Sequence, residues 1–160
     1  MPNSLKAGPV ARPRPKAPAI LFALAAFLLG GAARAAPPTG ITLSDPWFRF
    51  ITPAIPAAGY FTLSNSTADA QTLVGASSPD CGSLMLHRSV VKNGAEEMVM
   101  VPSVLVPAHG KLQFAPGGYH LMCMSPAAAM RPGRSAPVTL RFDGGAALDA
   151  TFPVRNATGK

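Results

Sequence analysis

Proline and glycine divide almost the whole sequence after residue 36 into short apolar pieces. The chain has 18 prolines and 15 glycines among 160 residues, and beyond that point no stretch of ten or more residues keeps a helical period without one of them. Proline interrupts a helix because it lacks an N–H, and glycine weakens one. The pieces are rich in valine, leucine, phenylalanine and threonine, which favour strands. The sequence therefore predicts an all-β protein.

Nine short strands are expected, and their close spacing indicates a Greek-key β-sandwich or barrel. The predicted strands cover residues 41–50, 58–65, 71–76, 83–91, 97–104, 111–115, 118–124, 136–142 and 147–154.

The first 35 residues have the pattern of an export signal. Four basic residues precede an apolar run over residues 18–31, and Ala33 and Ala35 supply the small residues that a signal peptidase reads. Cleavage after Ala35 is expected to leave residues 36–160 as a single domain in the periplasm. The run is short for a membrane-spanning helix, and no cysteine lies near the cleavage position, so neither a membrane anchor nor a lipid anchor is expected.

Removal of this segment changes the electrostatic interpretation of the chain. The full sequence has a net charge of +7, but five of its 14 basic residues and none of its seven acidic residues lie in the first 35 positions. The remaining nine basic and seven acidic residues give about +2, which provides no reason to expect a nucleic-acid partner.

The two cysteines, Cys81 and Cys123, both lie in the predicted domain. Disulfides persist in exported proteins, so a bond between these two residues is expected. Closing a loop of about 42 residues would stabilise the fold by roughly 4 kcal/mol in the chain-entropy model.

An Asn-Gly pair at 93–94 joins two predicted strands, and this pair favours a two-residue type I′ hairpin turn. Opposed residues then have numbers that sum to 187, so His87 faces Met100 and lies diagonal to Met98. The three side chains are therefore expected to share one face of the hairpin.

The strand predicted over residues 118–124 divides in the same way, because side chains alternate between faces along a strand. His120, Met122 and Met124 point to one face, and Cys123 points to the other. Neutral imidazole and uncharged thioether are soft ligands that suit Cu(I), whereas zinc prefers thiolates or more histidines. Methionine stripes are more often core packing than metal ligands, but two histidines on these faces would need polar partners in a dry core.

The spacing of four of these residues resembles the H-x10-M-x21-H-x-M pattern of the periplasmic copper chaperone family called PCu(A)C. The pattern falls on His87, Met98, His120 and Met122. The resemblance continues in "AGYFTLSN" (58–65), "LVGASSP" (73–79), "KNGAEEMVMV" (92–101) and "FAPGGYHLM" (114–122).

This resemblance implies a cupredoxin-like β-sandwich that binds one Cu(I) through those four residues. Met100 and Met124 lie on the same faces and are possible auxiliary ligands. The family also implies transfer of copper by ligand exchange, either to the CuA-bearing subunit of cytochrome c oxidase or to another periplasmic copper carrier.

Three other functions are alternatives to copper delivery. Copper sequestration for tolerance would use the same site without an acceptor. An electron-transfer cupredoxin would need a His2Cys site, and Cys123 faces the wrong way for one. No enzymatic activity is expected, because no carboxylate pair accompanies the histidines. The mature protein is expected to be a monomer.

Overall fold

Ten strands form one continuous sheet in the computed structural model, which describes residues 35–160. The predicted signal peptide therefore lies outside the described residues, apart from Ala35. The elements are β1 (Ile41–Arg49), β2 (Ala57–Asn65), β3 (Gln71–Ser77), β4 (Cys81–Lys92), β5 (Ala95–Met100), β6 (Val104–Val106), β7 (Lys111–Phe114), β8 (Tyr119–Pro126), β9 (Ser135–Phe142), the single 3-10 turn η1 (Asp143–Gly145) and β10 (Ala147–Arg155).

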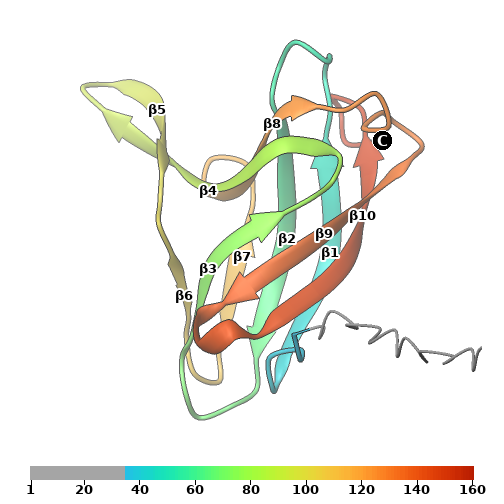
Figure 1. Cartoon of the computed structure of the whole chain (residues 1–160). Coiled ribbons are helices and arrows are strands. Elements are labelled where there is room, and N and C mark those ends of the chain that lie inside the picture. Colours follow the sequence, from blue (N-terminus) through green and yellow to red (C-terminus); the bar gives the residue numbers. More distant parts are fainter. Residues whose placement is uncertain (1–34) are drawn as a thin grey trace, which may run out of the picture. The chain divides into compact units, whose positions relative to one another are not determined.

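The sheet folds over into two layers that enclose one core. Its strand order is β5-β4-β8-β7-β2-β1-β10-β9-β3-β6, and the parallel pairing of β1 with β10 joins the two layers (Figure 1). Phe152 from β10 lies 5.3 Å from Phe48 of β1 and 5.7 Å from Phe61 of β2, measured between ring centroids. All three side chains are fully buried or nearly so. These contacts confirm the predicted β-sandwich.

One predicted strand was wrong. Residues 97–104 were expected to be a single strand, but β5 ends at Met100 and Val104 begins β6, which pairs with β3 in the other layer. Val101 donates the last backbone hydrogen bond to Leu86, and Pro102 has no N–H with which to continue the ladder. The chain therefore leaves one layer at Pro102 and enters the other. The other eight predicted ranges agree with the structure to within two residues at either end.

The β4–β5 hairpin has the predicted turn and the predicted register. Asn93 and Gly94 have φ angles of 53° and 81°, as a type I′ turn requires. His87 lies opposite Met100, and the pairing continues in step along the hairpin to its last pair beside the turn. All six residues of β5 are exposed, so the hairpin projects from the sandwich (Figure 1).

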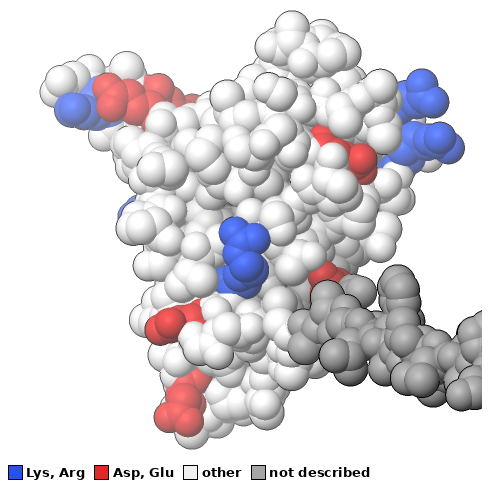
Figure 2. Space-filling view, viewed as in Figure 1, with Lys and Arg blue, Asp and Glu red and all other residues white. Residues whose placement is uncertain are grey.

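Charged side chains on the face seen in Figure 2 lie in small separate groups with uncharged surface between them. One group is at the end of the β4–β5 hairpin, where Lys92, Glu96 and Glu97 follow one another closely in sequence. Within residues 35–160, no helix has the length and apolar character needed to cross a membrane.

Candidate metal centre

Two histidines lie side by side on the outer face of the layer that contains β4 and β8. His87 pairs with His120 across these strands, and the two rings are stacked with centroids 5.9 Å apart and planes inclined by 23°. The next residues along each strand, Leu86 and Leu121, point the other way into the hydrophobic core. The alternation that the sequence predicted therefore holds on both strands.

Both histidines are buried and each keeps one nitrogen without a partner. His87 is 8% exposed and His120 is 4% exposed. Among the described residues, no hydrogen-bond partner is found for Nδ1 of His87 or Nε2 of His120. Buried polar atoms are nearly always hydrogen-bonded, so two orphaned nitrogens on adjacent rings indicate a site for a ligand.

The free nitrogen of His120 follows from its backbone contact. The Nδ1–H of His120 donates to the carbonyl oxygen of Gly118 at 3.2 Å, which assigns the neutral tautomer with a lone pair on Nε2. Burial lowers the pKa of His120; the hydrogen bond to Gly118 opposes this effect, while His87 and Arg49 add to it. The neutral ring that a metal ion requires is therefore the favoured form.

Methionines occupy strand positions close to the two histidines on the same face. Met122 lies opposite Met85 in the row next to the histidine pair, and Met98 is diagonal to His87 on the hairpin. Met98 is 57% exposed, whereas Met122 is partly buried. Within residues 35–160, no group of three or more His, Cys, Asp or Glu side chains is placed to hold a metal ion, so any further ligands beside the two histidines would have to be methionines.

The two other methionines on these faces are Met100 and Met124. Met100 faces His87 across the hairpin and is 65% exposed. Met124 lies opposite Ser83, further along β8. Neither Met100 nor Met124 lines the pocket into which His120, Met98 and Met122 open.

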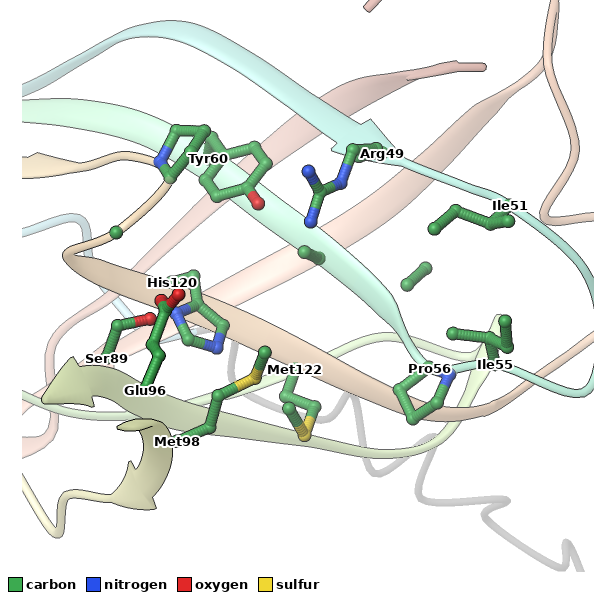
Figure 3. A pocket seen from close by; sticks show the side chains of 14 residues that line it. Arg49, Ile51, Ile55, Pro56, Tyr60, Ser89, Glu96, Met98, His120 and Met122 are labelled. Carbon is green, nitrogen blue, oxygen red and sulfur yellow. The ribbon is translucent and has the colours of Figure 1, made fainter. Parts of the chain in front are cut away.

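A pocket of about 500 Å³ lies directly beside the site. Its floor follows one row of paired residues, in which Arg49 of β1 faces Ala58 of β2 and Ala58 faces Met122 of β8. Since Ala58 carries only a methyl group, the row leaves space between the guanidinium and the thioether. Figure 3 shows Met98, Met122 and His120 close together on one side of this pocket, with Arg49 and Tyr60 across from them.

Sequence reasoning missed the polar residues that share this pocket, which are Arg49, Tyr60, Ser89 and Glu96. Burial raises the pKa of Tyr60, and the nearby Arg49 opposes this rise, so the phenol stays protonated. Nothing in the spacing of the motif points to Arg49 or Tyr60, because their strands, β1 and β2, are far in sequence from β4 and β8.

The predicted disulfide is present. Cys81 and Cys123 are joined with an S–S distance of 2.04 Å and a Cα–Cα distance of 5.3 Å. Cys123 is fully buried in the core, on the face opposite His120 and Met122. No free cysteine remains, so the His2Cys site of an electron-transfer cupredoxin is excluded.

Comparison with known proteins assigns the chain to a family. The profile of a family described as "Putative lipoprotein LpqE-like" matches residues 41–154. The protein "Putative lipoprotein Lxx21020" from Leifsonia xyli subsp. xyli (strain CTCB07) is 36% identical over 121 residues, which are 75% of this chain and 72% of that protein.

Two solved structures have a similar fold. The solution structure of CuI-DR1885 from Deinococcus radiodurans is 31% identical, with a TM-score of 0.57 over 77% of this chain and 81% of that one. The copper-bound PCuAC domain from PmoF2 has a TM-score of 0.61 at 22% identity, over 78% of this chain and 99% of that domain. The cupredoxin-like fold is therefore confirmed. The chain belongs to the LpqE-like family, and the resemblance to PCu(A)C proteins, first visible in the spacing of four residues, is confirmed.

Proposed function

We propose that this protein is a periplasmic chaperone that binds one Cu(I) and passes it on. The observation that carries the proposal is the pair of buried imidazole nitrogens, on His87 and His120, that have no protein partner within residues 35–160 and lie among thioethers. Copper is here the cargo. The proposed ligands are His87, Met98, His120 and Met122, with Met100 as an auxiliary ligand at the exposed edge and Met124 as a more distant one.

The donor set supports the monovalent ion. Two neutral imidazoles and two thioethers add no negative charge, and soft uncharged ligands favour Cu(I) over zinc or the hard divalent ions. The structures of CuI-DR1885 and of the copper-bound PmoF2 domain show that similar proteins carry copper.

Transfer to an acceptor is the second part of the proposal. A site without thiolates holds Cu(I) less strongly than one with them, so an acceptor that offers cysteine thiolates would draw the ion away. The proposed acceptor is the CuA-bearing subunit of cytochrome c oxidase or another periplasmic copper carrier. The proposed location is the periplasm, reached by an N-terminal signal cleaved after Ala35; the mass of the exported protein would test that cleavage.

Cu(I) titration of the wild type, His120→Ala and His109→Ala tests the binding site. His109 lies in an exposed turn and is the matched control. One Cu(I) per chain should bind to the wild type and to His109→Ala, whereas His120→Ala should lose the stoichiometric site. Equal binding by all three proteins would contradict the proposal.

Incubation of the loaded protein with an apo CuA domain distinguishes delivery from sequestration. Delivery predicts that copper moves to the CuA domain, and sequestration predicts that it stays with the chaperone.

A further inference from the structure

Arg49 is a cation on the wall of the pocket opposite the proposed copper ligands (Figure 3). Its side chain is half-buried, and its guanidinium carbon lies 5.8 Å from the centre of the Tyr60 ring. Among residues 35–160, no carboxylate forms an ion pair with it. A charge that is partly withdrawn from water and left without a counter-ion is costly, so its position requires an explanation.

Holding the metal does not explain this charge. Arg49 lines the same pocket as Met98, His120 and Met122, so its charge acts within the site. A fixed positive charge there opposes the binding of a monovalent cation. Arg49 therefore favours the binding of an anion in the pocket. An anion bound there would lie next to the proposed copper ligands.

We propose that the pocket receives a cysteine thiolate of the copper acceptor, and that Arg49 is the residue that draws it to the metal. This inference rests on the proposed function. A thiolate combines negative charge with soft sulfur, so it is attracted by Arg49 and binds Cu(I) more strongly than a thioether does. The space above Ala58 lies between the guanidinium and Met122, where an incoming sulfur has access to both.

The surroundings of the pocket fit a cysteine presented on a protein segment. Ile51 and Ile55, in the connection between β1 and β2, line the pocket and are 48% and 45% exposed. They offer apolar contact to the residues that flank the cysteine. On the other side Met98 stands on the exposed strand β5, so it is the proposed ligand that can leave with the least rearrangement.

The exchange needs no oxidant or reductant. The acceptor thiol first loses its proton to solvent, and a neighbouring cation favours this loss because it lowers the thiol pKa. The thiolate then forms a Cu–S bond as the bond to the Met98 thioether breaks. A second acceptor thiolate displaces the remaining ligands in the same manner, and copper stays monovalent throughout.

The opposite wall of the pocket carries the opposite charge. Glu96 lies on β5 beside Met98, and its carboxylate lines the same pocket. A carboxylate attracts Cu(I) and repels a thiolate, so its expected effect on the exchange is the reverse of that of Arg49. Neutralising Arg49 should therefore slow the transfer of copper, whereas neutralising Glu96 should not.

The test measures the rate at which dithiothreitol removes Cu(I) from the loaded full chain by stopped flow at pH 7.5. The variants are Arg49→Gln, Arg49→Lys, Glu96→Gln and Arg88→Gln. Arg88 is the matched control, because it lies on β4 next to His87 but is exposed on the other face, 5.2 Å from the Tyr119 ring. Each Arg→Gln change removes one positive charge from the chain.

Arg49→Gln should slow the transfer by about tenfold or more, which is the lower end of electrostatic effects on association. It should also weaken the dependence of the rate on salt. Arg49→Lys should retain most of the rate, Glu96→Gln should not slow it, and Arg88→Gln should stay within about twofold of the wild type. Copper affinity of Arg49→Gln should be equal to that of the wild type or higher.

Three results would overturn the inference. The first is transfer by Arg49→Gln at the wild-type rate. The second is an equal loss in Arg88→Gln, which would point to net charge alone. The third is an equal slowing when N-methylimidazole, which binds Cu(I) as a neutral ligand, replaces dithiothreitol. If the wild type itself binds no Cu(I), the proposed function fails and the inference fails with it; if it binds Cu(I) and Arg49 has no effect, the inference fails alone.

Discussion

His120 has a free nitrogen because a backbone carbonyl two residues earlier occupies the other one. The contact with Gly118 fixes the tautomer, and the burial of the ring favours its neutral form. A metal ion competes with protons for the same lone pair. The contact with Gly118 therefore leaves Nε2 of His120 available to a metal ion in the metal-free protein.

The first prediction concerns the stability of the metal-free protein at low pH. Since the folded pKa of His120 lies below the ordinary imidazole value of 6.5, the unfolded chain takes up this proton at a higher pH than the folded chain does. The free energy of unfolding should therefore fall as the pH drops through about 6.5 towards the folded pKa, and this contribution should be constant above that window. Urea denaturation at pH 7.5, 6.5 and 5.5 would measure the change.

His120→Gln and the exposed His109→Gln serve as the pair of controls. The first variant should lose part of the pH dependence and the second should keep all of it. An identical slope in the wild type and in His120→Gln would show that another group is responsible.

The β4–β5 hairpin determines whether Met98 and Met100 stay near the histidines. A slip by one residue would move every methionine of β5 to the other face. The type I′ turn at Asn93 and Gly94 prevents such a slip, since both residues have positive φ. The sheet contributes little else at this edge, because β5 pairs with β4 alone.

Replacement of Gly94 by valine tests this element. A β-branched residue at a φ of 81° is strained by about 1–2 kcal/mol, so the turn should change and displace Met98. Cu(I) affinity is expected to fall by about tenfold or more, as it does when the support of a metal ligand is lost. A competition titration with a chromophoric Cu(I) chelator would measure it.

Gly133→Val is the matched variant. Gly133 has a φ of 82° and, like Gly94, has no atom within 4 Å of an added Cβ, but it lies in the connection between β8 and β9. It should lower stability and leave copper affinity unchanged. If both variants lost affinity equally, general destabilisation would explain the result.

The sandwich has its proposed metal site and its disulfide on opposite faces of the same strands. Cys123 of β8 turns into the core while Met122 and its neighbour Met124 turn outward. The bond to Cys81 links the start of β4 to β8 and closes a separation of 42 residues. The disulfide is therefore expected to stabilise the folded state and to have little effect on metal binding.

The double variant Cys81→Ser, Cys123→Ser should unfold with a free energy lower by roughly 4 kcal/mol, the chain-entropy value for a loop of this size. Cu(I) stoichiometry and affinity should be retained at temperatures where the variant is folded. Thermal denaturation and Cu(I) titration of the same preparation would check both statements. A loss of copper binding in folded protein would show that the cysteines support the site.

Local patterns were sufficient for much of the fold and for the alternation at the site. The Asn-Gly pair set the hairpin register, and the period of two along β8 separated Met122 from Cys123 correctly. The change of layer at Pro102 was missed because valines on either side of it continue the strand pattern. Arg49 was missed because its approach to Met122 depends on the pairing of β1 and β2 with β8, which is distant from both in sequence, and no local pattern encodes that pairing.

The chemistry of sulfur in this protein has a consequence for encounters with partners rich in cysteine. A methionine thioether has no thiolate form, so it cannot attack a disulfide or be captured in a mixed one. The two cysteines are already joined, and Cys123 is fully buried. The proposed chaperone would therefore meet an acceptor dithiol and separate from it without forming the mixed disulfide that a thiol-based carrier could form in an oxidising compartment.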